Sequence, residues 1–228
     1  MQQITLDIGT PLVPTLDNFY PGPNAEVHSY IREWLAAVST ASVASTVGVY
    51  IAGPAGSGKS HLVVAVAGAL IGKGQLVGVL RPDSPAGLLF EPAWSAIILE
   101  DVQAYDSALQ HTAFNWYVNA QSEHRAVFAT GTVMPRALTV REDLRTRLGG
   151  GQVFHMKALS ESEVRMVLRS SAQQRGLVLG DEVLDFVMHR FSRDLGSLMP
   201  LLAALDHYAL QTQRAITIPF VKTMLERL

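Results

Sequence analysis

Cysteine is absent from this sequence. Disulfide bonds and thiol chemistry are therefore excluded, and the absence favours a cytoplasmic protein. No apolar run reaches the ~18–20 residues that a membrane-spanning helix needs, and no basic segment leads into an apolar stretch at the N-terminus. We therefore expect no membrane partner and no secretory signal. The histidines lack the spacing of metal ligands, and no Ser/His/Asp set indicates a hydrolase.

Positive charge is also scarce, since 18 Lys and Arg residues stand against 20 Asp and Glu residues, which gives a net charge of −2. No run of Lys or Arg supplies the basic footprint of proteins that bind DNA directly. A hydrophobic content of 48% in 228 residues is enough for a buried core in one or two domains. These values predict a globular protein that does not bind DNA tightly by itself.

A phosphate-binding loop is predicted within residues 47–70 (VGVYIAGPAGSGKSHLVVAVAGAL). An apolar strand, the pattern G-x-x-x-x-G-K-S and a small-residue helix follow one another there, which is the context that a P-loop requires. Glycines let backbone N–H groups turn toward phosphate oxygens, and the helix N-terminus adds partial positive charge. The residues expected to contact the nucleotide are Gly53, Pro54, Ala55, Gly56, Ser57, Gly58, Lys59, Ser60 and His61.

Two side chains of this loop are predicted to bind charged groups, one the phosphates and the other the metal ion. Lys59 is expected to reach the outer phosphates, and the Ser60 hydroxyl is expected to ligate Mg²⁺. His61 has the position of a packing or surface residue rather than of a catalyst. The loop therefore predicts binding of a nucleoside di- or triphosphate.

Strands alternate with helices as far as residue 157, which predicts a parallel sheet covered on both faces, an α/β/α sandwich. The apolar strand predicted over residues 96–101 ends in Glu100 and Asp101, and the following strand ends at Thr130. We expect the acidic strand to run beside the P-loop strand, so that its carboxylates face Mg²⁺ and the terminal phosphate. We assign Glu100 to the metal, partly through water, and Asp101 to the attacking water; a solvated acidic turn is the alternative. Thr130 is placed to contact the γ-phosphate, although threonine often ends strands.

Arg141, Arg145 and Arg147 cluster in residues 140–151 (VREDLRTRLGGG). An arginine before a glycine-rich break can project as a finger toward the phosphate of a neighbouring subunit, and Arg147 has that position. A solvated helix face, paired with the acids between the arginines, fits the same pattern. Arg193, at the start of a later helix, either bends back to the nucleotide or is solvated.

The segments that flank this core have their own signals. Gln3, Leu6 and Ile8 belong to an alternating stretch typical of a peptide that lies extended in a partner's groove, or of an edge strand or frayed terminus. Phe19 lies in a turn-rich loop and either covers a nucleotide base or plugs the core. Asn24 is expected to cap the first helix.

The pattern changes after residue 157, where consecutive helices predict a small bundle. Ser160 and Glu163 form a capping box, and Asp181 is expected to cap the next helix. Pro200 is tolerable only in the first turn of its helix. We therefore divide the chain into an extended peptide (1–14), a P-loop core (15–157) and a helical lid (158–228).

In this order the motifs resemble an AAA+ ATPase, and more narrowly the ATPase core of the DnaA family. Residues 15–19 (TLDNF) are similar to the entry motif of that family, residues 97–103 (IILEDVQ) to its Walker B segment and residues 144–148 (LRTRL) to its arginine-finger box. A DnaA-type helix-turn-helix domain is not found. Residues 216–222 (ITIPFVK) and the leader 3–8 resemble the DnaA-related regulatory inactivators of the Hda family, whose leader is a sliding-clamp-binding peptide.

The resemblance implies partners and roles that the residues alone do not. It implies that Gln3, Leu6 and Ile8 bind the DNA polymerase III sliding clamp (β subunit), that DNA is reached through the clamp, and that Arg147 acts on ATP held by DnaA. It also implies an ADP-bound working state, with ADP or ATP and Mg²⁺ as cofactors. Oligomeric state is left open, and a homo-oligomer is compatible.

Three positions depart from the family pattern. Glu100 replaces the usual Asp. The sensor-1 region, residues 130–132, reads Thr-Gly-Thr and contains no acid. The sensor-2 arginine is either Arg193 or replaced by Gly196. We expect these changes to weaken intrinsic ATP hydrolysis more than nucleotide binding. The alternatives are a helicase loader or DNA-remodelling motor of the same superfamily, and a nucleotide-gated adaptor without a finger.

Overall fold

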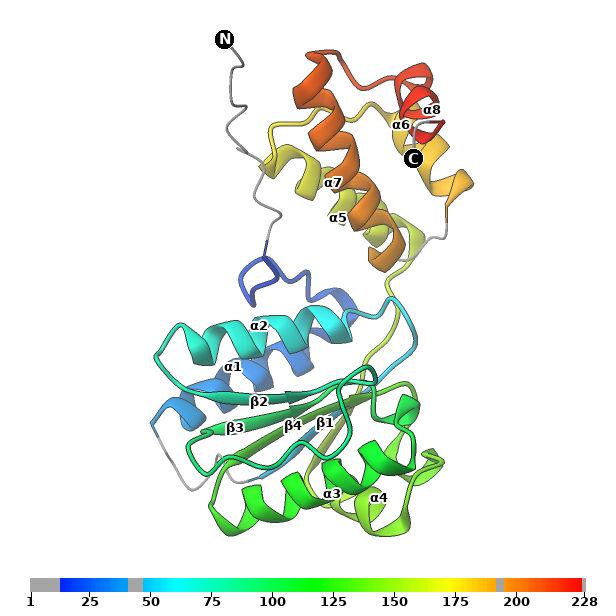
Figure 1. The fold of residues 1–228 in the computed structure, drawn as a ribbon. Helices are drawn as coiled ribbons and strands as arrows, with labels where there is room; N and C mark the ends of the chain where they lie inside the picture. Colours follow the sequence, from blue (N-terminus) through cyan, green and yellow to red (C-terminus); the bar gives the residue numbers. More distant parts are fainter. Residues whose placement is uncertain (1–12, 41–46, 192–194, 227–228) are drawn as a thin grey trace. The chain divides into compact units, whose positions relative to one another are not determined.

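The computed structural model describes residues 13–40, 47–191 and 195–226. These residues form two compact units, one spanning Pro14–Ala158 and the other containing Leu159–Leu228. In Figure 1 the first is the α/β core and the second is the helical lid. Within the described ranges, no helix is long and apolar enough to cross a membrane.

The core is built on a parallel sheet of five strands in the order β2-β3-β4-β1-β5. The strands are β1 (Val49–Ala52), β2 (Val77–Leu80), β3 (Ala96–Leu99), β4 (Ala126–Gly131) and β5 (Gln152–His155). All residues of β1, β3 and β4 are buried, as expected for strands covered on both faces. The predicted α/β architecture with a parallel sheet is confirmed.

One part of the predicted sheet is wrong. The acidic strand β3 does not run beside the P-loop strand β1, because β4 lies between them and pairs with both. Alternation of strands and helices predicts parallel pairing but not the order in which strands lie side by side. Thr130 on β4 is therefore nearer to the P-loop strand than the acidic pair is.

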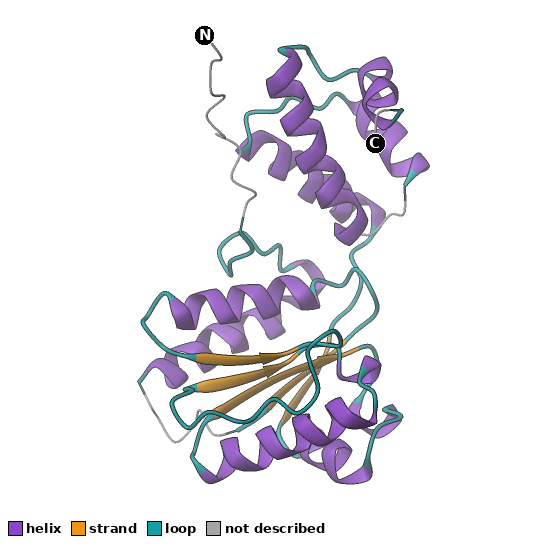
Figure 2. Cartoon of the chain, in the orientation of Figure 1, coloured by secondary structure: helices purple, strands orange, loops and turns teal. Residues whose placement is uncertain are grey.

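Helices cover the two faces of the sheet, as Figure 2 shows. One face carries α1 (Ala25–Ser39) and α2 (Lys59–Ile71), and the other carries α3 (Ser107–Ser122) and α4 (Glu142–Gly149). Alternate residues of β1 point to opposite sides, Val49 and Ile51 into the α1/α2 core and Tyr50 and Ala52 into the α3/α4 core. Short 3₁₀ turns complete the core: η1 (Gly22–Asn24), η3 (Val102–Ala104) and η4 (Pro135–Ala137).

Asn24 occupies the N-cap position of α1, but its side chain makes no cap hydrogen bond. Instead the buried amide forms two bonds with the main chain of Lys157, donating to its carbonyl at 3.0 Å and accepting from its N–H at 2.8 Å. The predicted helix cap is therefore wrong. The residue joins the start of the core to the segment that follows β5.

The lid consists of α5 (Glu161–Gln174), α6 (Asp181–Arg190), α7 (Leu195–Thr212) and α8 (Ile218–Leu225) around one apolar cluster. The capping box of Ser160 and Glu163 is confirmed. Asp181 does not cap α6, because it is the first helical residue and its carboxylate pairs with Arg165 and Arg169 of α5. Pro200 lies inside α7 beyond its first turn, contrary to the prediction.

Candidate functional site

The P-loop connects the carboxyl end of β1 to α2, and its glycines are required by its shape. Gly56 and Gly58 have positive φ angles of 74° and 98°, which side chains rarely adopt. A Cβ atom on Gly58 would lie 2.9 Å from the ring of Phe19, and one on Gly53 would lie 2.8 Å from Ser57 Oγ. The loop is therefore a narrow turn that leaves no room for larger residues at these positions.

Lys59, the first residue of α2, is buried and turned back onto this loop. Its Nζ atom donates to the carbonyl oxygens of Gly53 at 2.8 Å and Pro54 at 2.9 Å. Burial lowers the pKa of Lys59, and the nearby charge of Asp101 opposes that shift. A phosphate group bound in the loop would give this ammonium a negatively charged partner.

Other groups of the loop also fit a phosphate and its metal. The Ser57 hydroxyl is buried without a hydrogen-bond partner among the described residues, so an acceptor in the loop would satisfy it. Ser60 is exposed at the start of α2, available to a metal. No group of three or more His, Asp or Glu side chains within the described ranges could hold a metal alone. Mg²⁺ beside a nucleotide typically takes few protein ligands and several phosphate and water oxygens, so the loop fits that pair.

The two acids after β3 have different surroundings. Glu100 accepts a hydrogen bond from Arg81 Nε at 3.0 Å, so its carboxylate is paired with the residue that follows β2. Asp101 has a left-handed backbone, and its N–H donates to Thr130 Oγ1 at 3.0 Å. The charge of Asp101 opposes the lowering of the Lys59 pKa. Burial raises the pKa of the Tyr50 phenol, and the charge of Asp101 raises it further. The metal role assigned to Glu100 stays a prediction, whereas Asp101 is the acid electrostatically coupled to the P-loop.

Phe19 is a core residue next to the P-loop rather than an exposed cover. Its ring is stacked on His28 at 5.5 Å between centroids and meets His61 edge-on at 5.3 Å. His61 Nε2 donates to the carbonyl of Thr15 at 2.8 Å, and burial lowers the pKa of its imidazole. The entry loop is thereby fastened onto α2, and contact of Phe19 or His61 with a nucleotide stays a prediction.

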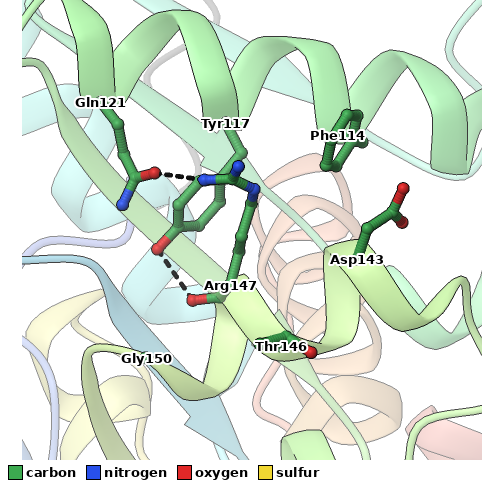
Figure 3. A pocket seen from close by; sticks show the side chains of 7 residues that line it. All are labelled: Phe114, Tyr117, Gln121, Asp143, Thr146, Arg147 and Gly150. Carbon is green, nitrogen blue, oxygen red and sulfur yellow. Dashed lines mark hydrogen bonds between the residues drawn. The ribbon is translucent and has the colours of Figure 1, made fainter.

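The predicted finger, Arg147, lies at a surface pocket of about 470 Å³ between α3 and α4 (Figure 3). Its Nη1 donates to Gln121 Oε1 at 2.5 Å, and its guanidinium carbon lies 5.3 Å from the centre of the Phe114 ring. Gln121 was not among the site residues predicted from the sequence. The available signal was its spacing of seven residues from Phe114 along the same helix, which places both on one face.

The other two arginines of the 140–151 cluster, Arg141 and Arg145, have different contacts. Arg141 donates through Nε and Nη2 to both carboxylate oxygens of Asp143 and through Nη1 to His111. Arg145 makes no side-chain hydrogen bond or ion pair with the part of the chain that the structure describes. Of the two arginines stacked on Phe114, only Arg147 therefore keeps most of its donors available.

The P-loop and Arg147 lie at opposite ends of β1. The P-loop follows the carboxyl end of this strand, whereas α4 leads into β5, whose first residue Gln152 donates to the carbonyl of Gly48 just before β1. The strand itself covers about 13 Å at 3.3 Å per residue. Arg147 is therefore remote from the phosphate loop of its own chain.

Four predicted residues lie outside the described ranges. They are Gln3, Leu6 and Ile8 of the leader and Arg193 before α7. Their assigned roles in clamp binding and nucleotide sensing stay predictions.

Comparison with known proteins gives relatives for both units. Residues 161–225 match the family model described as "Hda, lid domain". Domain III of the replication initiation protein DnaA from Thermotoga maritima has the same fold, with a TM-score of 0.72, 17% identity and coverage of 96% of this chain and 98% of that one.

Two further solved structures resemble the chain more distantly. AMPPCP-bound DnaA from Aquifex aeolicus has a TM-score of 0.65 and 22% identity, covering 81% of this chain and 62% of that one. The Thermotoga maritima RuvB Holliday junction branch migration motor has a TM-score of 0.63 and 16% identity, covering 94% and 72%. The α/β core and lid thus have the fold that these solved structures share, and residues 161–225 match the lid domain of Hda.

Proposed function

We propose that this protein regulates the initiation of chromosome replication by promoting hydrolysis of ATP bound to the initiator DnaA. Arg147 would enter the nucleotide site of DnaA and stabilise the charge that develops on the transferred phosphoryl group. The product would be the ADP form of DnaA. The DnaA-like fold and the Hda-type lid support this assignment.

The observation that carries the proposal is the position of Arg147. It lies beyond the amino end of β1, while the P-loop lies at the carboxyl end, so this arginine is remote from its own nucleotide. An arginine with free donors at that position can serve a phosphate of another molecule. Arg141, which has the same stacking partner, is fully engaged by Asp143 and His111 and does not meet this requirement.

The nucleotide of this chain has a different task in the proposal. The P-loop with Lys59, Ser57 and Ser60 fits ADP or ATP with Mg²⁺, and DnaA structures with a bound nucleotide analogue share the fold. Because Glu100 is paired with Arg81, we propose that bound ADP fixes a conformation and that intrinsic turnover is weak. The bound nucleotide would set the conformation of the lid, and its hydrolysis would not be required.

Recruitment is assigned to the leader. Gln3, Leu6 and Ile8 would bind the sliding clamp, which brings the protein to DNA without a basic surface of its own. Clamp binding by a Gln3→Ala, Leu6→Ala variant tests this step. We expect binding to be lost; undiminished binding would remove the clamp from the proposal.

The decisive experiment measures single-turnover hydrolysis of ATP held by DnaA in the presence of clamp-loaded DNA. Arg147→Ala is expected to lower the stimulated rate by about 10³-fold or more, since an arginine finger contributes ~10³–10⁵. Arg145→Ala, two residues away on the same helix, is the matched control and is expected to behave as wild type. Full stimulation by Arg147→Ala would contradict the proposal and favour a nucleotide-gated adaptor.

A motor of the same superfamily is the second candidate, favoured by the intact P-loop and by the likeness to the RuvB motor. It predicts substantial ATP turnover by this chain alone, lost in Lys59→Ala. It also predicts no role for residues 3–8. Measuring intrinsic turnover therefore separates a motor or helicase loader from the regulator.

A further inference from the structure

The guanidinium of Arg147 is held by two side chains of α3 that the proposed reaction has not used. Figure 3 shows Gln121 and Arg147 pointing toward each other, with Phe114 on the same helix. Gln121 Oε1 accepts from Nη1 at 2.5 Å, and the Phe114 ring centre lies 5.3 Å from the guanidinium carbon. One contact fixes an edge of the planar group and the other fixes a face.

The same helix also holds the main chain of this arginine. Tyr117 donates its phenolic proton to the carbonyl oxygen of Arg147 at 2.9 Å. Phe114, Tyr117 and Gln121 are spaced three and four residues apart, so they form one stripe along α3. This stripe therefore contacts both the main chain near the end of α4 and the Arg147 side chain.

The contacts leave a binding edge available. Among the described residues the Arg147 guanidinium makes no hydrogen bond beyond the one to Gln121, so Nε and Nη2 remain as donors. Those two atoms form the kind of fork that matches two oxygens of a phosphate. In Arg141 the same pair of atoms is occupied by the Asp143 carboxylate.

We infer that Gln121 and Phe114 are positioning residues that hold Arg147 ready for the phosphate of a partner-bound nucleotide. This inference rests on the proposed function. A free arginine side chain has many rotamers, and ordering one during a reaction costs about 0.5–1.5 kcal/mol. Holding the guanidinium beforehand removes that cost from the chemical step, while neither Gln121 nor Phe114 touches the reacting atoms.

The test measures stimulated single-turnover hydrolysis by DnaA as a function of the concentration of this protein. Gln121→Met keeps the length of the side chain without a good acceptor, and Phe114→Leu keeps apolar volume without a ring face. Each is expected to lower the maximal rate about 3- to 10-fold, in line with the ordering cost of one side chain. The concentration for half-maximal stimulation is expected to stay unchanged. Asn119→Met, on the same helix and likewise exposed but bonded to the Asn115 carbonyl and not to Arg147, is the matched control and should match wild type.

The inference also requires that these effects depend on Arg147. Combined with Arg147→Ala, the Gln121→Met change is expected to have no further effect on the rate. An additional loss in that background would indicate a purely structural role and overturn the inference. Wild-type rates for Gln121→Met and Phe114→Leu beside a large loss for Arg147→Ala would overturn it as well, while the proposed function would stand. No loss for Arg147→Ala would overturn both.

Discussion

At the carboxyl end of β1, Lys59 donates its protons to two carbonyl oxygens of its own loop, whereas beyond the amino end Arg147 uses a single nitrogen on Gln121. The first cation is buried within a loop of its own chain. The second is part-exposed at a surface pocket. We therefore propose that the two cations serve different molecules, and changes at one end should leave the other end unaffected.

The largest effect on nucleotide affinity is expected at the carboxyl end. Lys59→Ala removes a charge-assisted contact to phosphate, which is worth about 1.5–3 kcal/mol, so ADP affinity should fall about 10- to 100-fold. Isothermal titration calorimetry measures the change. Lys73→Ala, just beyond the C-terminal end of α2, is the control and should bind as wild type. Unchanged affinity in Lys59→Ala would mean that the loop does not bind phosphate.

A smaller effect is expected at the amino end. Tyr117→Phe removes the hydrogen bond from the phenol to the Arg147 carbonyl, which should lower the free energy of unfolding by about 1 kcal/mol in urea titrations. ADP affinity should not change, because α4 is remote from the P-loop. Tyr30→Phe is the control, since that side chain packs its ring on Phe154 and its hydroxyl makes no hydrogen bond to a described residue. A fall in ADP affinity would break the separation of the two ends.

The smallest effect is a pH dependence at His61. Burial lowers the pKa of this imidazole, with the charge of His28 acting in the same direction and the bond to Thr15 opposing. The folded chain therefore binds its proton less readily than the unfolded chain, so stability should fall as the pH drops below about 6.5. His61→Gln keeps a donor near Thr15 without titrating. Its melting temperature should fall less than that of wild type between about pH 7.5 and about pH 5.5, and an equal fall would contradict the assignment.

Local signals in the sequence predicted much of the fold. The P-loop pattern, the buried parallel strands, the capping box of α5 and the helical lid all depend on residues close together in the chain. Phe19 was open between two interpretations; its ring contacts with His28 and His61 place it in the core, and contact with a nucleotide base stays a prediction.

The remaining features depend on residues that are distant in sequence. The strand order that inserts β4 between β1 and β3 is a property of the whole sheet. Asn24 pairs with a main chain 133 residues away, and Gln121 with an arginine 26 residues away. Side-chain amides have no periodic pattern that would reveal such partners. Pro200 lies inside α7, where its fixed φ is compatible with a helix although its missing N–H costs a bond.

The central claim is that Arg147 serves a nucleotide of another molecule while the P-loop binds a nucleotide of its own. One variant tests both halves when ADP affinity and stimulated hydrolysis by DnaA are measured on the same preparation of Arg147→Ala. We predict wild-type ADP affinity together with a loss of about 10³-fold or more in stimulation. Weakened ADP binding with unimpaired stimulation would contradict the account.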